Sequence, residues 1–259
     1  MEIGVSTGCF YPALTEEALD TALGLGFRTV EVFLNTPSEV EPAFSREMRA
    51  KAEAAGARIV SLHPYFSLAE PFCLFSRYER RFFDALSDYR RQFEAAATVG
   101  ASFLILHGDR ADQPPLSPEQ FAERYERLYD EGQRFGVTLL QENVAKYRAS
   151  DPAFVRQMRA LLGEKARFAL DLKQCRLTGV PAADMIDAMG PGLCHVHFSD
   201  GTEEAPCLLP GEGREDFAAL FQKLRESGYR GDGVIELYRR NYKEPEELPR
   251  GRKYLLEQM

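Results

Sequence analysis

Apolar positions along the chain follow two alternating patterns, short continuous runs and longer segments with a helical spacing. Eight short runs are rich in Val, Ile, Leu and Phe, as strands buried on both faces of a parallel sheet are. They cover residues 3–7, 29–34, 58–63, 102–107, 137–142, 167–172, 194–199 and 233–238. The pattern predicts eight buried strands separated by helices.

Seven amphipathic segments between these strands have apolar residues three or four positions apart, which predicts helices. They cover residues 15–25, 45–55, 78–99, 117–135, 152–162, 182–188 and 216–227. Thr15, Ser117 and Asp151 each stand where a side chain can cap the first turn of a helix. Glycines such as Gly100 and Gly136 follow helices at the position where a left-handed residue ends them. The start and stop residues agree with the apolar spacing.

Strands that alternate with helices form parallel sheets through right-handed crossovers. Eight such units in 259 residues predict an α/β protein, a (β/α)8 TIM barrel in a single domain covering residues 1–259. An open Rossmann-like sheet is the alternative architecture. No G-x-G-x-x-G follows the first strand, which disfavours a dinucleotide-binding fold.

The charge balance is acidic, with 40 Asp and Glu against 32 Lys and Arg and a net charge of −8. Proteins that bind phosphate backbones recruit basic surface, so this balance disfavours a nucleic-acid partner. A local site can differ in sign from the whole chain, so an anionic small molecule stays compatible with the composition.

The five cysteines are widely spaced, odd in number and without a C-x-x-C pair. They indicate reduced thiols rather than a disulfide framework or a zinc finger. No apolar run reaches the roughly 18 residues that span a bilayer, and the N-terminus lacks the regions of a signal peptide. These features predict a soluble, cytoplasmic protein without a membrane partner.

Four polar residues close otherwise apolar strands: Glu142, Asp171, His197 and Glu236. A carboxylate at the end of a buried strand costs desolvation energy unless a cation or hydrogen bonds compensate it. The carboxyl ends of barrel strands share one mouth, where three carboxylates without a cation would repel one another. The set therefore predicts one divalent metal ion, with Mn²⁺, Mg²⁺ or Co²⁺ favoured and Zn²⁺ possible.

All four histidines of the chain fall in or at the end of predicted strands, and Glu31 lies in another strand near its end. His195 and His197 are two positions apart and point to the same side of one strand. We expect His195, one layer deeper, to be a buried hydrogen-bonded histidine. His63 and His107 are expected to hold substrate oxygens or a second metal, with a structural role as the rival interpretation.

Nine short motifs lie in order along nearly the whole chain. They are GVSTGCF in the first strand, VEVF with Glu31, SLHPY with His63 and Tyr65, LILHGD with His107, QEN with Glu142, ALDL with Asp171, HVHFSD with His197, PGEG at 210–213, and VIEL with Glu236. In this order and spacing they resemble the xylose-isomerase-like superfamily of TIM barrels. That superfamily includes sugar phosphate isomerases and epimerases, an inosose dehydratase, and AP endonuclease family 2 with endonuclease IV.

The resemblance implies a metal-dependent sugar isomerase or epimerase. Glu142, Asp171, His197 and Glu236 match the metal ligands of the superfamily, and Glu142 and Glu236 match its acid/base pair. In such enzymes the metal chelates two adjacent oxygens of a sugar, sugar phosphate or polyol-derived ketose and stabilises an enediolate. One glutamate takes the proton beside the carbonyl and the other returns one. The expected substrate contacts are His63, His107, Gln174, Tyr65, Glu31 and Arg214.

The chain departs from the superfamily pattern at three places. Gln174 stands where Asp-x-x-His would place a histidine after Asp171, and Glu203 stands near the position of a common arginine. The Asp-x-His that endonuclease IV carries before the PGEG turn is absent, which disfavours cleavage of abasic DNA. An inosose-type dehydratase acting at the same metal site, an endonuclease IV-like repair hydrolase and a non-catalytic sugar binder are the alternatives.

Two loops remain open to interpretation. PGEG at 210–213 is expected to be a tight turn, with a phosphate cradle assisted by Arg214 as the alternative. The aromatic-rich loop 64–75 has three interpretations: a loop packed on the barrel rim, a lid, or a contact in a homo-oligomer.

Overall fold

The structure is a computed structural model that describes residues 1–111 and 116–259. Eight parallel strands follow one another in chain order around a closed barrel, and β1 pairs with β8 to complete it. The strands are β1 (Ile3–Ser6), β2 (Thr29–Phe33), β3 (Arg58–His63), β4 (Phe103–Leu106), β5 (Thr138–Glu142), β6 (Phe168–Asp171), β7 (Leu193–Phe198) and β8 (Gly233–Ile235). The predicted (β/α)8 barrel is confirmed, and the open sheet is excluded.

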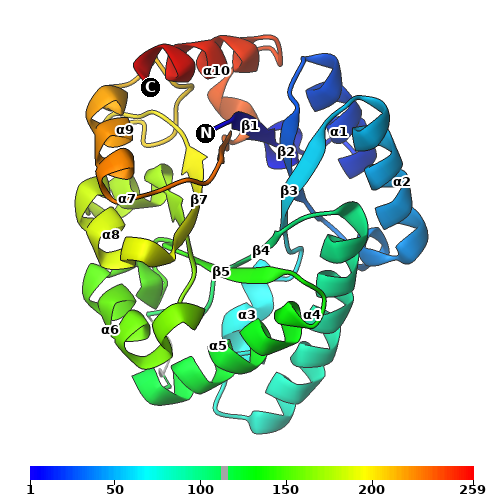
Figure 1. Ribbon diagram of the computed structural model, residues 1–259, viewed down its shortest axis with the longest axis vertical. Helices are drawn as coiled ribbons and strands as arrows, with labels where there is room; N and C mark the ends of the chain where they lie inside the picture. Colours follow the sequence, from blue (N-terminus) through cyan, green and yellow to red (C-terminus); the bar gives the residue numbers. More distant parts are fainter. Residues whose placement is uncertain (112–115) are drawn as a thin grey trace.

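Helices surround the strands on the outside of the barrel, as Figure 1 shows. The seven predicted helices are α1 (Thr15–Gly24), α2 (Pro42–Ala54), α4 (Glu79–Val99), α5 (Pro118–Gln133), α6 (Pro152–Leu162), α8 (Ala182–Met189) and α9 (Phe217–Glu226). Three more were not predicted: α3 (Glu70–Cys73), α7 (Leu172–Thr178) and α10 (Glu247–Gln258). Helix α10 packs against β1 and β8, the two strands that close the barrel. Among the described helices, none combines the length and the apolar character needed to cross a membrane.

Side-chain caps explain several of the helix starts. Ser117 and Gln120 form a reciprocal capping box at α5, and Asp151 caps α6 by accepting a hydrogen bond from the Ala153 N–H. The expected cap at Thr15 is wrong, because Thr15 is the first residue of α1. Its hydroxyl instead donates to Glu39 Oε1 at 3.0 Å.

Six of the eight strands end earlier than their apolar runs predict, and at β4 and β8 this moves a candidate residue out of the strand. Strand β4 ends at Leu106 and β8 at Ile235, so His107 and Glu236 are the first residues of the loops that follow. The Glu236 N–H still donates to the Phe198 carbonyl at 3.1 Å. The candidate side chains at these positions therefore lie at the barrel mouth, held by the ends of the strands.

Candidate active site

The four residues proposed from the sequence as metal ligands come together at the barrel mouth. Glu142 and Asp171 are the last residues of β5 and β6, His197 lies in β7, and Glu236 follows β8. One ligand atom from each of the four lies within 4.8 Å of those of the others. The side chains therefore point to a common centre, and strands five to eight of the barrel position them.

His197 lies in the middle of this group. Its Nδ1 atom is 3.3 Å from Glu142 Oε1 and 3.2 Å from Glu236 Oε2. Burial alone would lower the pKa of His197, but the surrounding carboxylates raise it well above its usual value. The same contacts hold the pKa of Glu142 well below its usual range against the opposing effect of burial. Without a metal, the histidine thus supplies part of the positive charge that the carboxylates require.

Two buried oxygens of the group make no hydrogen bond, although each has a nitrogen within ion-pair distance. Glu142 Oε2 is one of them, and Asp171 Oδ2 is the other. Buried carboxylate oxygens without hydrogen bonds are costly, and three carboxylates with one imidazole form a donor set suited to a hard or borderline divalent cation. The residues present therefore fit the divalent metal ion expected from the sequence.

A buried lysine, which the sequence interpretation missed, completes the charge balance. Lys173 Nζ lies 3.1 Å from Asp171 Oδ2 and 3.4 Å from Glu236 Oε2, and the residue is only 5% exposed. Burial raises the pKa of Asp171 to about 6, with Lys173 opposing the shift and the neighbouring carboxylates adding to it. The sequence feature that could have identified Lys173 is its position two residues after Asp171, the carboxylate that ends β6.

Helix α7 explains how Lys173 reaches the site. Asp171 caps this helix, because its Oδ1 atom accepts hydrogen bonds from the Lys173 N–H at 2.7 Å and the Gln174 N–H at 3.3 Å. The cap uses one oxygen of Asp171 and leaves Oδ2 facing the common centre. Helix α7 therefore fixes the orientation of a candidate ligand and places a cation beside it.

A second group shares Glu142 with the first. One atom each from His63, His107 and Glu142 lies within 4.8 Å of the others. The two Nε2 atoms of the histidines are 3.0 Å apart, and Glu142 Oε2 lies 3.1 Å from that of His107. Burial lowers the pKa of His107, but Glu142 outweighs it and the net shift is upward. The group has the composition for a second cation or for hydrogen bonds to substrate oxygens.

Glu31 and His195 lie beneath this layer and are fully buried. Glu31 Oε2 is 3.1 Å from His197 Nε2 and accepts a hydrogen bond from the Ser61 hydroxyl at 2.8 Å. His195 Nε2 is 3.6 Å from the same oxygen. His195 thus has the deep position expected for it, whereas Glu31 contacts His197 from below.

The other three predicted substrate contacts lie apart from the four-residue group. Gln174 accepts a hydrogen bond from the Ala145 N–H at 2.9 Å, so its side chain holds the loop after β5. Tyr65 is half-buried and packs edge-on against Phe66. Arg214 is exposed in the loop that follows β7.

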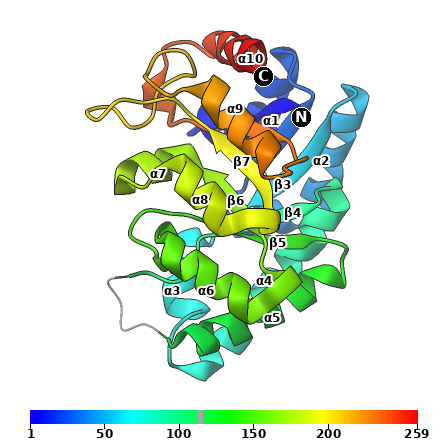
Figure 2. The ribbon, with the colours of Figure 1, turned by 60° about the vertical axis from the view of Figure 1, so that its left-hand side comes forward.

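The PGEG segment is a tight turn held by Asp200. The carboxylate of Asp200 accepts hydrogen bonds from the N–H groups of Gly201 at 2.8 Å, Gly211 at 2.9 Å and Glu215 at 3.0 Å. A phosphate cradle would need such N–H groups free. The loop, yellow in Figure 2, projects from the barrel between β7 and α9. Its backbone donors support the tight turn over the phosphate cradle.

The loop 64–75 is anchored to the barrel mouth by Glu70, another residue missed in the sequence. Its buried carboxyl accepts hydrogen bonds from the N–H groups of His107 at 2.8 Å and Gly108 at 2.7 Å, and from the Tyr89 hydroxyl. Burial raises the pKa of this carboxyl. Leu68 in the same loop is 82% exposed. The segment is therefore packed on the rim through Glu70, with one apolar side chain facing outward.

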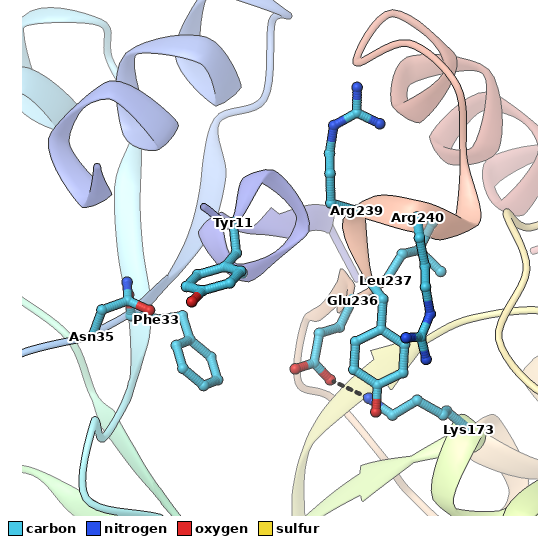
Figure 3. Close-up of a pocket in the computed structure, with 10 residues that line it drawn as sticks. Tyr11, Phe33, Asn35, Lys173, Glu236, Leu237, Arg239 and Arg240 are labelled. Carbon is cyan, nitrogen blue, oxygen red and sulfur yellow. Dashed lines mark hydrogen bonds and ion pairs between the residues drawn. The ribbon is translucent and has the colours of Figure 1, made fainter. Parts of the chain in front are cut away.

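A pocket of about 630 Å³ opens beside Glu236. Figure 3 shows Tyr11, Phe33 and Asn35 on one side of it and Glu236, Lys173 and Arg240 on the other. The remaining lining residues are Gly8, Leu237, Tyr238 and Arg239. The pocket places a candidate proton-transfer group and a buried cation next to space for a small molecule.

Comparisons with known proteins agree on the fold. Residues 19–258 match the family model described as xylose isomerase-like TIM barrel. An uncharacterized protein of Mycobacterium bovis is 27% identical over 280 residues, which cover 92% of this chain and 89% of that protein. The fructoselysine 3-epimerase of Shigella flexneri is 21% identical over 243 residues, which cover 89% of this chain and 87% of the epimerase. The crystal structure of a D-tagatose 3-epimerase-like protein superposes with a TM-score of 0.82 at 19% identity, covering 99% and 97% of the two chains.

Proposed function

Because the chain belongs to the xylose isomerase-like TIM barrel family, we propose that it is a metal-dependent isomerase or epimerase of a sugar. The supporting observation is the pair of carboxylates at the mouth, Glu142 at the end of β5 and Glu236 after β8, with His197 between them. A reaction that moves a proton at a carbon beside a carbonyl needs two such groups around one substrate. The names of the Shigella flexneri relative and of the similar solved structure, both epimerases or epimerase-like, favour the same class.

Glu142, Asp171, His197 and Glu236 would hold one divalent cation, with Mn²⁺, Mg²⁺ or Co²⁺ favoured and Zn²⁺ possible. When bound, such an ion supplies positive charge to two adjacent substrate oxygens and so stabilises the negative charge that develops on them. His63 and His107, which flank Glu142, would hold further hydroxyl groups. The substrate is therefore polar and carries vicinal oxygens, as a ketose does.

The surroundings of the two proposed proton-transfer groups keep both of them ionised. Burial would raise the pKa of Glu236, but Lys173 and His197 lower it to about 2. Glu142 is held ionised by its histidine neighbours. One carboxylate can therefore remove the proton beside the carbonyl and become a carboxylic acid. The other must first gain a proton from solvent before it can deliver one to the same or the neighbouring carbon. Glu236 lines the pocket and contacts the substrate there.

Solvent exchange tests this function. The protein with added Mg²⁺ is incubated with a panel of ketoses in D₂O, and the products are followed by NMR. We expect incorporation of one deuterium at a carbon beside the carbonyl without loss of water. The Glu236→Gln variant should exchange at least about 100-fold more slowly, the usual contribution of a positioned acid or base. Loss of water would instead identify a dehydratase, and the absence of exchange with every ketose and metal would contradict the proposal.

A further inference from the structure

Two cations lie on one aromatic ring in the wall of the pocket. Lys173 Nζ is 4.9 Å from the centre of the Tyr238 ring, and Arg240 Cζ is 5.1 Å from it. Lys173 also contacts Glu236, so the contacts lead from a proposed proton-transfer group through Lys173 and Tyr238 to Arg240. Figure 3 shows Arg240 on the same side of the pocket as Lys173 and Glu236.

Arg240 carries a charge that nothing in the described parts of the chain neutralises. Lys173 is balanced by Asp171 and Glu236. Across residues 1–111 and 116–259, Arg240 has no carboxylate within ion-pair distance, and its side chain is exposed at the pocket. The neighbouring Arg239 differs, because its guanidinium donates to the carbonyls of Tyr242 and Lys243. Arg240 is thus the lining arginine that is free to meet a ligand.

The pocket is cationic although the whole chain is not. Its lining holds three cations, Lys173, Arg239 and Arg240, against one carboxylate, Glu236. The net charge of the chain is −8, so the positive charge of the pocket lining is opposite in sign to that of the whole chain. The facing wall consists of Tyr11, Phe33 and Asn35, which offer hydrogen bonds and apolar surface without a charge.

We propose that the substrate carries an anionic group, a phosphate or a carboxylate, which Arg240 binds at the rim of this pocket. A substrate whose reacting carbon lies against Glu236 directs its far end along Tyr238 toward Arg240. Guanidinium groups bind phosphate and carboxylate through paired, charge-assisted hydrogen bonds. The PGEG turn is not the anion site, because Asp200 already accepts its N–H groups. This inference rests on the proposed sugar isomerase or epimerase function and adds the class of its substrate.

Three ketoses that differ only at carbon 6 test the inference: D-fructose, D-fructuronate and D-fructose 6-phosphate. Each is titrated calorimetrically into the protein with Mg²⁺, for the wild type and for Arg240→Gln. At least one anionic ketose should bind about tenfold or more tightly than D-fructose, and Arg240→Gln should remove this gain. The anion with the larger gain, phosphate or carboxylate, identifies the chemistry. Arg250→Gln is the matched control, because Arg250 is an exposed arginine that pairs with Glu212 and does not line the pocket.

Binding of inorganic phosphate to the metal-free protein, measured by ³¹P NMR, tests the anion site without a sugar. It should bind to the wild type and to Arg250→Gln, and about tenfold more weakly to Arg240→Gln. Equal affinity for the three ketoses, an anionic gain that survives in Arg240→Gln, or failure of all four probes to bind would each overturn the inference.

The two proposals can fail separately. Exchange of D-fructose at the same rate as its anionic counterparts, unchanged by Arg240→Gln, would leave the isomerase or epimerase function and remove the anion site. If Arg240 increases the affinity for an anionic ketose but no ketose exchanges deuterium, the anion site is supported and the isomerase or epimerase function is contradicted.

Discussion

At the scale of single residues, His197 has carboxylates at both ring nitrogens. Glu31 lies at Nε2, while Glu142 and Glu236 lie at Nδ1. A histidine that binds a metal through one nitrogen usually donates its other N–H to a carboxylate, which fixes its tautomer and its ring orientation. Ser61 in turn fixes Glu31 with a hydrogen bond of 2.8 Å. The buried pair Glu31 and Ser61 therefore presents Nδ1 of His197 to the common centre.

Asp171 makes the stability of the metal-free protein depend on pH. Its pKa is raised from 3.8 to about 6, mainly by burial, so the native state binds this proton more tightly than the unfolded chain does. The contribution of Asp171 to stability is thus favourable at low pH and is lost as the pH rises from about 4 to about 6. Asp171→Asn, which cannot ionise, should therefore gain stability relative to the wild type between pH 4.5 and pH 7.5.

The measurement for Asp171 is urea unfolding in EDTA at both pH values. Glu131→Gln serves as the control. Glu131 is a buried carboxylate of α5 that pairs with Arg90 and contacts none of the four candidate ligands. A difference between Asp171→Asn and the wild type that is the same at both pH values would contradict the prediction.

At the scale of elements, short helices and loop residues complete a site that the strands begin. Helix α7 starts at the cap formed by Asp171 and carries Lys173 in its first turn. Glu70 in α3 holds the backbone of His107 and Gly108 at the end of β4. The loop after β7 is closed on itself by Asp200. Each connection thus stabilises the strand end beside it.

Lys173 should oppose metal binding, since its ammonium already neutralises Asp171 and Glu236. Charges about 4 Å apart interact by a few kcal/mol at the effective dielectric constant of a protein. Replacing Lys173 with Met should therefore tighten Mn²⁺ binding by about tenfold or more and lower the melting temperature of the metal-free protein. Calorimetric titration and thermal unfolding in EDTA measure the two effects.

Lys223→Met provides the matched control for this change, because Lys223 pairs with Asp187 on the outside of the barrel. Weaker Mn²⁺ binding by Lys173→Met than by the control would show that the lysine organises the ligands instead of competing with the metal.

The elements differ in how far the sequence predicts them. Glu142, Asp171 and His197 were identified because each lies in or ends a buried strand, and the apolar pattern marks such strands locally. Lys173 and Glu70 lie in helices of seven and four residues, too short for a helical period to be visible. Arg240 lies in a short 3-10 helix after β8 (Arg239–Asn241), and its place at the pocket depends on how that segment packs against the start of the chain. Helix α10 was missed because Pro249 and Gly251 interrupt its pattern.

At the scale of the whole molecule, the pocket depends on closure of the barrel. Its walls come from residues 8–35 and residues 236–240, apart from Lys173. The seam between these segments is held by Cys9 and Tyr242: the Leu237 N–H donates to Cys9 Sγ at 3.3 Å, and the Tyr242 hydroxyl donates to the Cys9 carbonyl at 2.6 Å. The pairing of β1 with β8 thus brings the two ends of the chain together to form the proposed substrate site.

The candidate ligands come from a large part of the barrel, since they lie in or directly after four successive strands, β5 to β8. Metal binding to such a set requires the closed barrel and is linked to folding, because the unfolded chain does not preform the site. A divalent cation at the common centre is therefore the feature on which the proposed function depends most.

An anomalous difference map from crystals grown with Mn²⁺ tests this claim most directly. We predict a peak at the common centre, coordinated by Glu142, Asp171, His197 and Glu236 and absent from crystals of the His197→Ala variant. A map without a peak at that centre, or with Mn²⁺ bound only elsewhere, would contradict the account.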